Sequence, residues 1–268
     1  MIMMNYKFNL QRSAVDERDF LLGTIYPDQV TLPEVWDLRS QMQPIRDQGS
    51  QGTCSAQTAA AMKEWQEKVD QGYNGYMSPQ FIYNLRESFG SEGMTPRDTM
   101  ALLNKVGIVH EHDYPYGKIE DLNPDALSPE LRDEALVNRI IGYARADTVD
   151  ALRKALFANG PCYIAFPVYN PEVMEFWKPQ FTGQQMLGGH AVCVAGYLKD
   201  KYIIRNSWSD KWGDKGYTYF PFTEWGIQWE AWTTIDEDSH QETLNDKVAA
   251  TKCTPGFFRK LFHKRIKK

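Results

Sequence analysis

The first half of the chain carries the pattern of hydrophobic and polar positions that is typical of helices. The segment 55–69 holds three consecutive alanines and no Gly or Pro, and Gly72 follows as a residue that ends helices. A Ser-Pro pair at 78–79 and a Thr-Pro pair at 95–96 each place a capping side chain before a proline suited to the first helical position. We therefore expect three helices here, the last ending near Gly107.

The second half changes to the pattern of short strands. One more helix fits 148–158, where Gly160 and Pro161 end it. Runs rich in Val, Ile, Tyr, Phe and Trp then alternate with turns of Gly, Asp and Lys, and they predict five strands. These runs are 162–168, 190–195, 202–205, 217–220 and 230–235. Helices followed by strands predict an α+β fold of two lobes, with the cleft between them as the natural place for an active site.

The two ends of the chain differ from this middle part. Residues 1–31 are polar with scattered apolar positions and predict an extended N-terminal arm. The folded domain is expected over 32–240, and 241–268 form a linker and a tail. The tail holds seven basic residues and no acid after position 250, so residues 1–250 carry −12 against −5 for the whole chain.

The tail has its own pattern. Phe258, Phe262 and Ile266 lie four residues apart with basic residues on the other faces, which predicts a short basic amphipathic helix. Three roles compete for it. The apolar stripe docks on the acidic body, or the basic face binds nucleic acid or an anionic membrane surface, or another protein reads the tail as a localisation signal. The sequence does not separate these roles.

Composition narrows the class of protein. With 268 residues, 42% of them hydrophobic and 24% charged, the chain is long enough to bury a full core. This excludes a disordered, collagen-like or disulfide-scaffold protein, and no run reaches the ~18 apolar residues of a membrane span. The N-terminus shows no secretory signal, and Cys162 and Cys193 lie within apolar strand-like runs, as buried thiols do. We expect a soluble protein of the cytoplasm or another reducing compartment, such as a virion.

The first residue with candidate chemistry is Cys54. It follows Gly49 and Gly52 closely and precedes the helical segment 55–69, so its thiol is expected at the N-terminus of a helix. Unpaired N–H groups and the helix dipole favour the thiolate there and lower the pKa of a cysteine. A small buried cysteine under a turn is the structural alternative, and this position alone does not decide between the two.

His190 and Asn206 complete a candidate catalytic set. His190 follows two glycines at the start of a buried strand, which holds its ring rigidly, as a catalytic base requires. Asn206 ends another strand, where its side chain is able to accept a hydrogen bond from a histidine ring and so fix the tautomer. Each alone fits an ordinary structural role. Their separations from Cys54, 136 and 152 residues, favour a common site.

Three segments resemble the papain-like cysteine proteases, the family of the cathepsins, in order and spacing. The nucleophile segment is 48–56, the histidine segment 189–192 and the asparagine segment 206–209. The resemblance spans about 32–235 and includes the Tyr-Pro-Tyr run at 114–116. It implies a two-lobe papain-like fold, with a helical left lobe, an antiparallel β-barrel-like right lobe and the active site between them. Bacterial and viral members with a short N-terminal arm are the nearest in style.

By this resemblance the chain is a thiol endopeptidase that hydrolyses peptide bonds through a thioester on Cys54. His190 would be the imidazolium partner of Cys54, and Asn206 would orient its ring. The side-chain amide of Gln48, with the backbone N–H of Cys54, would form the oxyanion hole. Trp208 would cover the contact between Asn206 and His190. The implied partner is a peptide or protein substrate, and no cofactor is implied.

The sequence departs from the family pattern at several positions. Ser55 stands where an aromatic residue is usual, and Gln51 stands where secreted members have a disulfide cysteine. Met94 follows Gly93 in place of the second glycine of the substrate-binding pair. The arm over 1–31 is too short for a folded pro-domain but long enough to cross a cleft. We expect this arm or short pro-segment to lie along the protein and partly block the site; a disordered tail is the alternative.

The resemblance also indicates where substrate binds. Pro96, Ala165 and Ala191 would form the walls of the S2 pocket, and their small apolar side chains would admit a bulky apolar P2 side chain. Packing within the core is the structural alternative for these three residues. The other predicted substrate-binding residues are Gly93, Met94, Gly189 and Trp208.

Two other classes of function stay open. A non-catalytic structural or binding protein could keep the protease fold, and Ser55 and Met94 are the features that suit it. An acyl transferase would use the same thioester on Cys54 but pass the acyl group to an amine.

One further run contains potential metal ligands. His110-Glu111-His112-Asp113 offers imidazoles and carboxylates within four residues. We expect a solvated loop rather than a metal site, because no cysteine or fourth ligand lies nearby in the sequence and the histidines lack the helical i, i+4 spacing of zincins.

Overall fold

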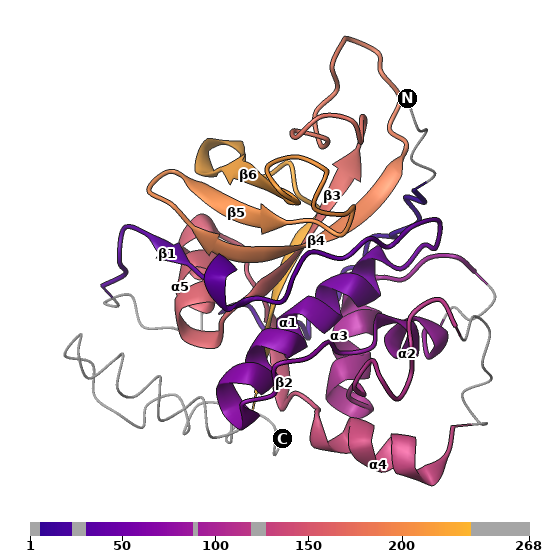
Figure 1. Cartoon of the computed structure of the whole chain (residues 1–268). Helices are drawn as coiled ribbons and strands as arrows, with labels where there is room; N and C mark the ends of the chain where they lie inside the picture. Colours follow the sequence, from indigo (N-terminus) through magenta and orange to yellow (C-terminus); the bar gives the residue numbers. More distant parts are fainter. Residues whose placement is uncertain (1–5, 23–30, 88–90, 119–126, 237–268) are drawn as a thin grey trace.

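The computed structural model describes residues 6–22, 31–87, 91–118 and 127–236. Helices gather in one portion of the molecule and strands in the other, so the α+β arrangement is as predicted (Figure 1). The predicted C-terminal tail, including its amphipathic helix, lies outside the described residues. No helix among those that the structure describes is long and apolar enough to cross a membrane.

The central element is helix α1 (Cys54–Gln71). Its residues from Cys54 to Glu67 are all buried, because the helix packs against α2 (Pro79–Asn84), α3 (Pro96–Lys105) and strand β4 (Gly188–Tyr197). Gly72 ends α1 in the left-handed conformation, at a φ of 72°.

The other helices begin at capping side chains. Ser78 and Thr95 accept hydrogen bonds from backbone N–H groups at the starts of α2 and α3, as predicted. Thr148 does the same at the start of the predicted helix α5 (Val149–Asn159). Ser128 caps α4 (Pro129–Val137) in the same way. That helix was not predicted, although its Ser-Pro pair carries the same signal as the one before α2. Short 3₁₀ turns cover Arg39–Gln41 and Phe222–Glu224.

One sheet forms the second portion, and its neighbouring strands pair antiparallel in the order β2-β7-β3-β4-β5-β6, with β1 on β4. The five predicted strands are β3 to β7. Two strands were not predicted, namely β1 (Trp36–Asp37) and β2 (Gly142–Arg145). The others are β3 (Cys162–Val168), β5 (Lys201–Arg205), β6 (Tyr217–Pro221) and β7 (Glu230–Ile235).

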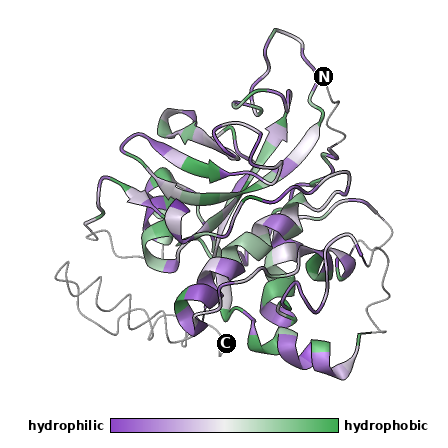
Figure 2. Ribbon diagram, in the orientation of Figure 1, coloured by the Kyte–Doolittle hydropathy of each residue, from purple (hydrophilic) through white to green (hydrophobic). Residues whose placement is uncertain are grey.

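Two apolar clusters hold these portions together. One lies mainly among the helices, and the other between the sheet and α5, where Figure 2 shows hydrophobic residues along the strands. The N-terminal arm contributes to both, since Leu10 belongs to the first cluster and the fully buried Leu22 to the second. Cys162 and Cys193 are buried free thiols, as their places within apolar strand-like runs predicted.

Candidate active site

Cys54 is the first residue of α1, as predicted, and its side chain is almost completely buried. The thiol lies against the backbone of Ala191, the residue after His190. Burial raises the pKa of the thiol to about 11, although hydrogen bonds with the backbone of Ala191 and Ser55 act in the opposite direction. The expectation of a lowered pKa at this helix N-terminus is therefore wrong for this form of the protein, because removal from water outweighs the helix dipole.

His190 lies on β4 and is fully buried. Its Nε2 is 2.8 Å from Oδ1 of Asn206. Because Oδ1 also accepts the N–H of Ser207, it is the acceptor, and Nε2 carries the proton of the neutral ring. Nδ1 has no hydrogen-bond partner among the described residues, which leaves it available to the nucleophile. Burial lowers the pKa of His190 to about 4, against the opposing effect of the bond to Asn206.

Aromatic rings enclose the contact between His190 and Asn206. The indole of Trp208 stacks on the imidazole, with ring centroids 4.3 Å apart and planes at 22°. Phe176 meets the same ring edge-on at 5.7 Å. Trp208 thus lies where the sequence placed it, and both rings keep water from the hydrogen bond.

Gln48 is held at both ends of its side-chain amide. Its Oε1 accepts from the hydroxyl of Ser207 at 2.8 Å, and its Nε2 donates to the carbonyl of Gln51 at 3.2 Å. The backbone N–H of Gln48 also donates to the carbonyl of Ser207. Sequence reasoning assigned no role to Ser207, although its place directly after Asn206 was a usable signal.

Ser55 joins a buried network of hydroxyl groups. Its Oγ lies 2.6 Å from the hydroxyl of Thr99 and 2.7 Å from that of Tyr163. Tyr163 comes from β3, so an aromatic ring from another element lies beside the position where the family usually has one next to the nucleophile. The departure at Ser55 is thus accommodated by polar contacts, and Thr99 and Tyr163 were not identified from the sequence.

The arm runs between β4 and the segment at Met94 and pairs with the predicted substrate-binding backbone. Gly189 donates to the carbonyl of Phe8 and accepts from the N–H of Leu10, and Gln11 donates to the carbonyl of Met94. A Cβ at Gly93 would lie 2.1 Å from the carbonyl oxygen of Asn9, and one at Gly189 would lie 2.5 Å from that of Leu10. The backbone of the arm therefore approaches β4 and the loop at Gly93 this closely only because both positions are glycines.

The side chains of the arm cover the catalytic candidates. Tyr6 stacks on Trp208 at 5.1 Å, and Phe8 meets the rings of Trp208 and His190 edge-on. Tyr6, Phe8 and Leu10 alternate with polar residues, which is the pattern of an extended segment with one buried face. This pattern was readable in the sequence and was not used.

Two of the predicted walls of the S2 pocket, Ala165 and Ala191, lie in one apolar cluster with Leu10 of the arm. Ala165 and Ala191 face each other in the register of β3 and β4, and both are fully buried. They belong to the same apolar cluster as Leu10 and Met94. Pro96 is the first residue of α3 and is buried.

The potential metal ligands form an ion-paired surface loop. Ligand atoms of His110, His112 and Asp113 lie within 4.8 Å of one another. His110 Nδ1 is 2.8 Å from a carboxylate oxygen of Glu134, and His112 Nε2 is 2.9 Å from one of Asp113. His112 is largely exposed, as a solvated loop residue is.

Known proteins with similar sequences are cysteine proteases or their viral relatives. The profile of the family described as "Papain family cysteine protease" matches residues 32–234. An uncharacterised peptidase C1-like protein of Acanthamoeba polyphaga mimivirus is 29% identical over 80% of this chain and 81% of its own length. A cathepsin L-like peptidase of Aedes aegypti is 28% identical over 72% of this chain, and the matched part spans 60% of that relative.

Solved structures agree with this assignment. Xylellain, a cysteine protease from Xylella fastidiosa, superimposes with a TM-score of 0.73 at 25% identity, over 87% of this chain and 97% of its own. A cysteine protease of Carica candamarcensis has the same fold, with a TM-score of 0.62 at 23% identity over 77% of this chain and 100% of its own. With the family profile covering most of its length, the chain belongs to the papain family of cysteine proteases.

Proposed function

We propose that the chain is a cysteine endopeptidase that cleaves peptide bonds through a thioester on Cys54. The observation that carries this proposal is the buried hydrogen bond between His190 Nε2 and Asn206 Oδ1. This bond leaves Nδ1 of His190 without a partner among the described residues and so available to Cys54. The thiol of Cys54 contacts the backbone of Ala191, the residue that follows His190. A histidine oriented in this way suits transfer of the thiol proton.

The chemistry has two stages. The sulfur of Cys54, having given its proton to His190, attacks the carbonyl carbon of the substrate, and the carbonyl electron pair moves to the oxygen. The side-chain amide of Gln48 and the N–H of Cys54 stabilise that oxyanion; removal of one such donor typically costs ~2.7–4 kcal/mol in the transition state. The oxyanion collapses, the C–N bond breaks, and His190 protonates the leaving amine. Water, deprotonated by His190, then hydrolyses the thioester and regenerates the thiol.

The N-terminal arm is proposed to inhibit this reaction in the form described. It occupies the backbone positions at Gly189 and Met94 that a substrate would need. It also buries the catalytic pair, and with the pKa of Cys54 raised to about 11 and that of His190 lowered to about 4, both groups are neutral near pH 7. Displacement of the arm would return water to the site and favour the reactive ion pair.

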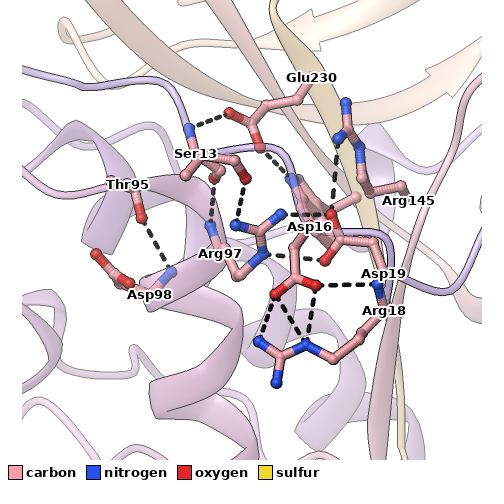
Figure 3. Close-up of polar contacts among 11 residues, drawn as sticks. Ser13, Asp16, Arg18, Asp19, Thr95, Arg97, Asp98, Arg145 and Glu230 are labelled. Carbon is pink, nitrogen blue, oxygen red and sulfur yellow. Dashed lines mark hydrogen bonds and ion pairs between the residues drawn. The ribbon is translucent and has the colours of Figure 1, made fainter.

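A second part of the arm grips α3. The guanidinium of Arg97 donates to both carboxylate oxygens of Asp19, with Nε 2.9 Å from Oδ1 (Figure 3). The same side chain donates to the carbonyl of Ala14, and its backbone N–H donates to the hydroxyl of Ser13. Residues 13–22, which we call the clasp, are thus fixed to the helical portion.

The clasp also reaches the sheet. Asp19 lies 3.6 Å from Arg145 of β2, and the N–H of Ser13 donates to Glu230 of β7 at 2.8 Å (Figure 3). Leu22 at its end is fully buried in the apolar cluster of the sheet. We infer that residues 6–11 block the cleft whereas the clasp is part of the fold.

The position of Leu10 supports the proposed preference for a substrate with a bulky apolar residue at P2. Leu10 is the arm side chain that joins the cluster of Met94, Ala165 and Ala191. A substrate with a bulky apolar residue at the equivalent place would bury similar area, worth ~1.5–3 kcal/mol for a side chain of this size.

The test is to treat the purified chain, with the arm shortened by residues 2–11, with an epoxide-type thiol-protease inhibitor under reducing conditions. Mass spectrometry is expected to find the label on Cys54, and a peptide library is expected to show cleavage at sites that carry a bulky apolar residue at P2. The Cys54→Ala variant is the control for both measurements. Absence of labelling and of cleavage would favour a non-catalytic protein, and amide products formed with an added amine would favour acyl transfer.

A further inference from the structure

A small, partly open cavity lies against the amide of Asn206, on a side that the catalytic scheme above does not use. Its volume is about 10 Å³, close to what one water molecule requires. Its lining includes Arg46, Gln57, Thr58, Ala61, Cys193 and Asn206. Gln57 and Thr58 belong to α1, so the cavity separates the helix of the nucleophile from the residue that orients His190.

Polar atoms of three lining residues, Arg46, Gln57 and Asn206, have no hydrogen-bond partner among the described residues. Oδ1 of Asn206 is bonded to His190 and to the N–H of Ser207, which directs Nδ2 elsewhere, and Nδ2 has no hydrogen-bond partner among the described residues. Neither polar atom of the Gln57 amide has one either, nor does Nε of Arg46. Asn206 and Gln57 are each only 3% exposed.

Protein groups close to Gln57 do not fill this need. The hydroxyl of Tyr116 lies beside the Gln57 amide, but its single proton goes to the carbonyl of Gln48, so it has none to donate to Gln57 Oε1. The hydroxyl of Thr58 donates to the carbonyl of Cys54. Buried amides normally find a partner in protein or in ordered water, and the latter needs a polar cavity of about this volume.

We propose that one water molecule binds in this cavity, accepting a hydrogen bond from Asn206 Nδ2 and donating one to Gln57 Oε1, which makes Gln57 a positioning residue for the His190–Asn206 pair. The water holds the far side of the Asn206 amide, so the amide does not rotate to present Nδ2 to the ring. His190 then keeps its proton on Nε2 and its acceptor on Nδ1. The catalytic consequence rests on the proposed peptidase function, whereas the water site itself does not.

The first experiment separates positioning from packing. Gln57→Met keeps the length of the side chain but removes both polar atoms, Gln57→Glu keeps an acceptor, and Gln66→Met is the matched control. Gln66 is equally buried on α1 but bonds Thr234 instead. We expect Gln57→Met to lower kcat by ~10–100-fold with KM within about twofold, because small misplacements at a reacting centre have effects of this size. Gln57→Glu should recover most of the loss. Equal kcat values for Gln57→Met and Gln66→Met would overturn the proposal.

The second experiment does not depend on activity. High-resolution crystal structures and proton NMR of the Cys54→Ala protein, with and without Gln57→Met, report on the water and on the Nε2 proton of His190. Density within hydrogen-bond distance of both Asn206 Nδ2 and Gln57, and an Nε2 proton signal that shifts or broadens in Gln57→Met, support the proposal even if no peptidase activity is found. A dry cavity, or an unchanged signal, overturns it even if Gln57→Met proves too unstable for kinetics.

Discussion

Phe8 of the arm meets His190 edge-on, with ring centroids 6.5 Å apart and planes at 87°. The two residues lie 182 positions apart in the chain. Their contact places the N-terminal arm directly against the proposed acid-base residue. The backbone of the arm also forms hydrogen bonds with Gly189 and Met94, two of the predicted substrate-binding residues.

Two truncations should therefore behave differently. Deletion of residues 2–11 removes the cleft-blocking part, including the buried Leu10, but leaves the clasp. It is expected to raise peptide turnover, with a smaller loss of thermal stability than a deletion that also removes the clasp. Deletion of residues 2–30 was expected from the sequence to raise turnover as well. It removes Leu22, which is fully buried, so it should also destabilise the protein by ~2–5 kcal/mol. Turnover of a short peptide and urea unfolding are measured for both variants. Unchanged turnover in the variant that lacks residues 2–11 would contradict the inhibitory role of the arm.

Substitution of the three described cysteines should affect different properties, turnover for one and stability for the other two. Cys54→Ala is expected to abolish turnover and inhibitor labelling, because no other described residue at this place supplies a thiol. Cys162→Ala and Cys193→Ala remove buried sulfurs from the sheet and should each cost ~1 kcal/mol of unfolding free energy while turnover per folded molecule persists. Retained wild-type turnover in Cys54→Ala would exclude it as the nucleophile.

The stability of the arm-covered form should depend on pH through the catalytic pair. The pKa of His190 is lowered from 6.5 to about 4, so the unfolded chain binds more protons between these values and stability falls as pH drops through this window. The pKa of Cys54 is raised from 9.0 to about 11, so stability falls again as pH rises through that range. The unfolding free energy lost through His190 between pH 6.5 and about 4 is on the order of 3 kcal/mol.

The measurement is thermal unfolding from pH 4 to 7 on the full chain, on His190→Gln and on the chain without residues 2–11. Both variants should show a flatter acid limb, the first because the titrating group is gone and the second because the ring regains water. Three parallel acid limbs would show that carboxylates elsewhere, not His190, set the pH dependence.

How far the sequence predicted this structure depended on how local each signal was. The caps at Ser78, Thr95 and Thr148 act within one helical turn, so they were readable, and Ser128 was equally readable but was overlooked. Strand β1 has only two residues and exists because it pairs with Gly196 and Tyr197 of β4, which no local pattern announces.

The residues of the candidate site also differed in how far the sequence predicted them. Cys54, His190 and Asn206 lie in motifs of fixed spacing, and the fold brings them together. The hydroxyls of Thr99 and Tyr163, which bond Ser55, come from separate elements and leave no common signal in the sequence. The effect of burial on the pKa of Cys54 was also unpredictable, since it depends on where the arm lies.

The clasp provides a last prediction, because it contains one shielded and one exposed ion pair within four residues. Asp19 is 8% exposed and pairs with Arg97, whereas Asp16 pairs with Arg18, whose side chain is 91% exposed. Asp19→Asn removes a buried charge that two arginines face and is expected to cost ~2 kcal/mol or more, since breaking shielded pairs is expensive. Asp16→Asn should not change stability measurably, because water screens its pair. Urea unfolding of both variants gives the costs. If the clasp also keeps residues 6–11 in the cleft, Asp19→Asn should raise peptide turnover and Asp16→Asn should not; equal behaviour of the two variants in both measurements would show that the Arg97 contact neither stabilises the fold nor retains the arm.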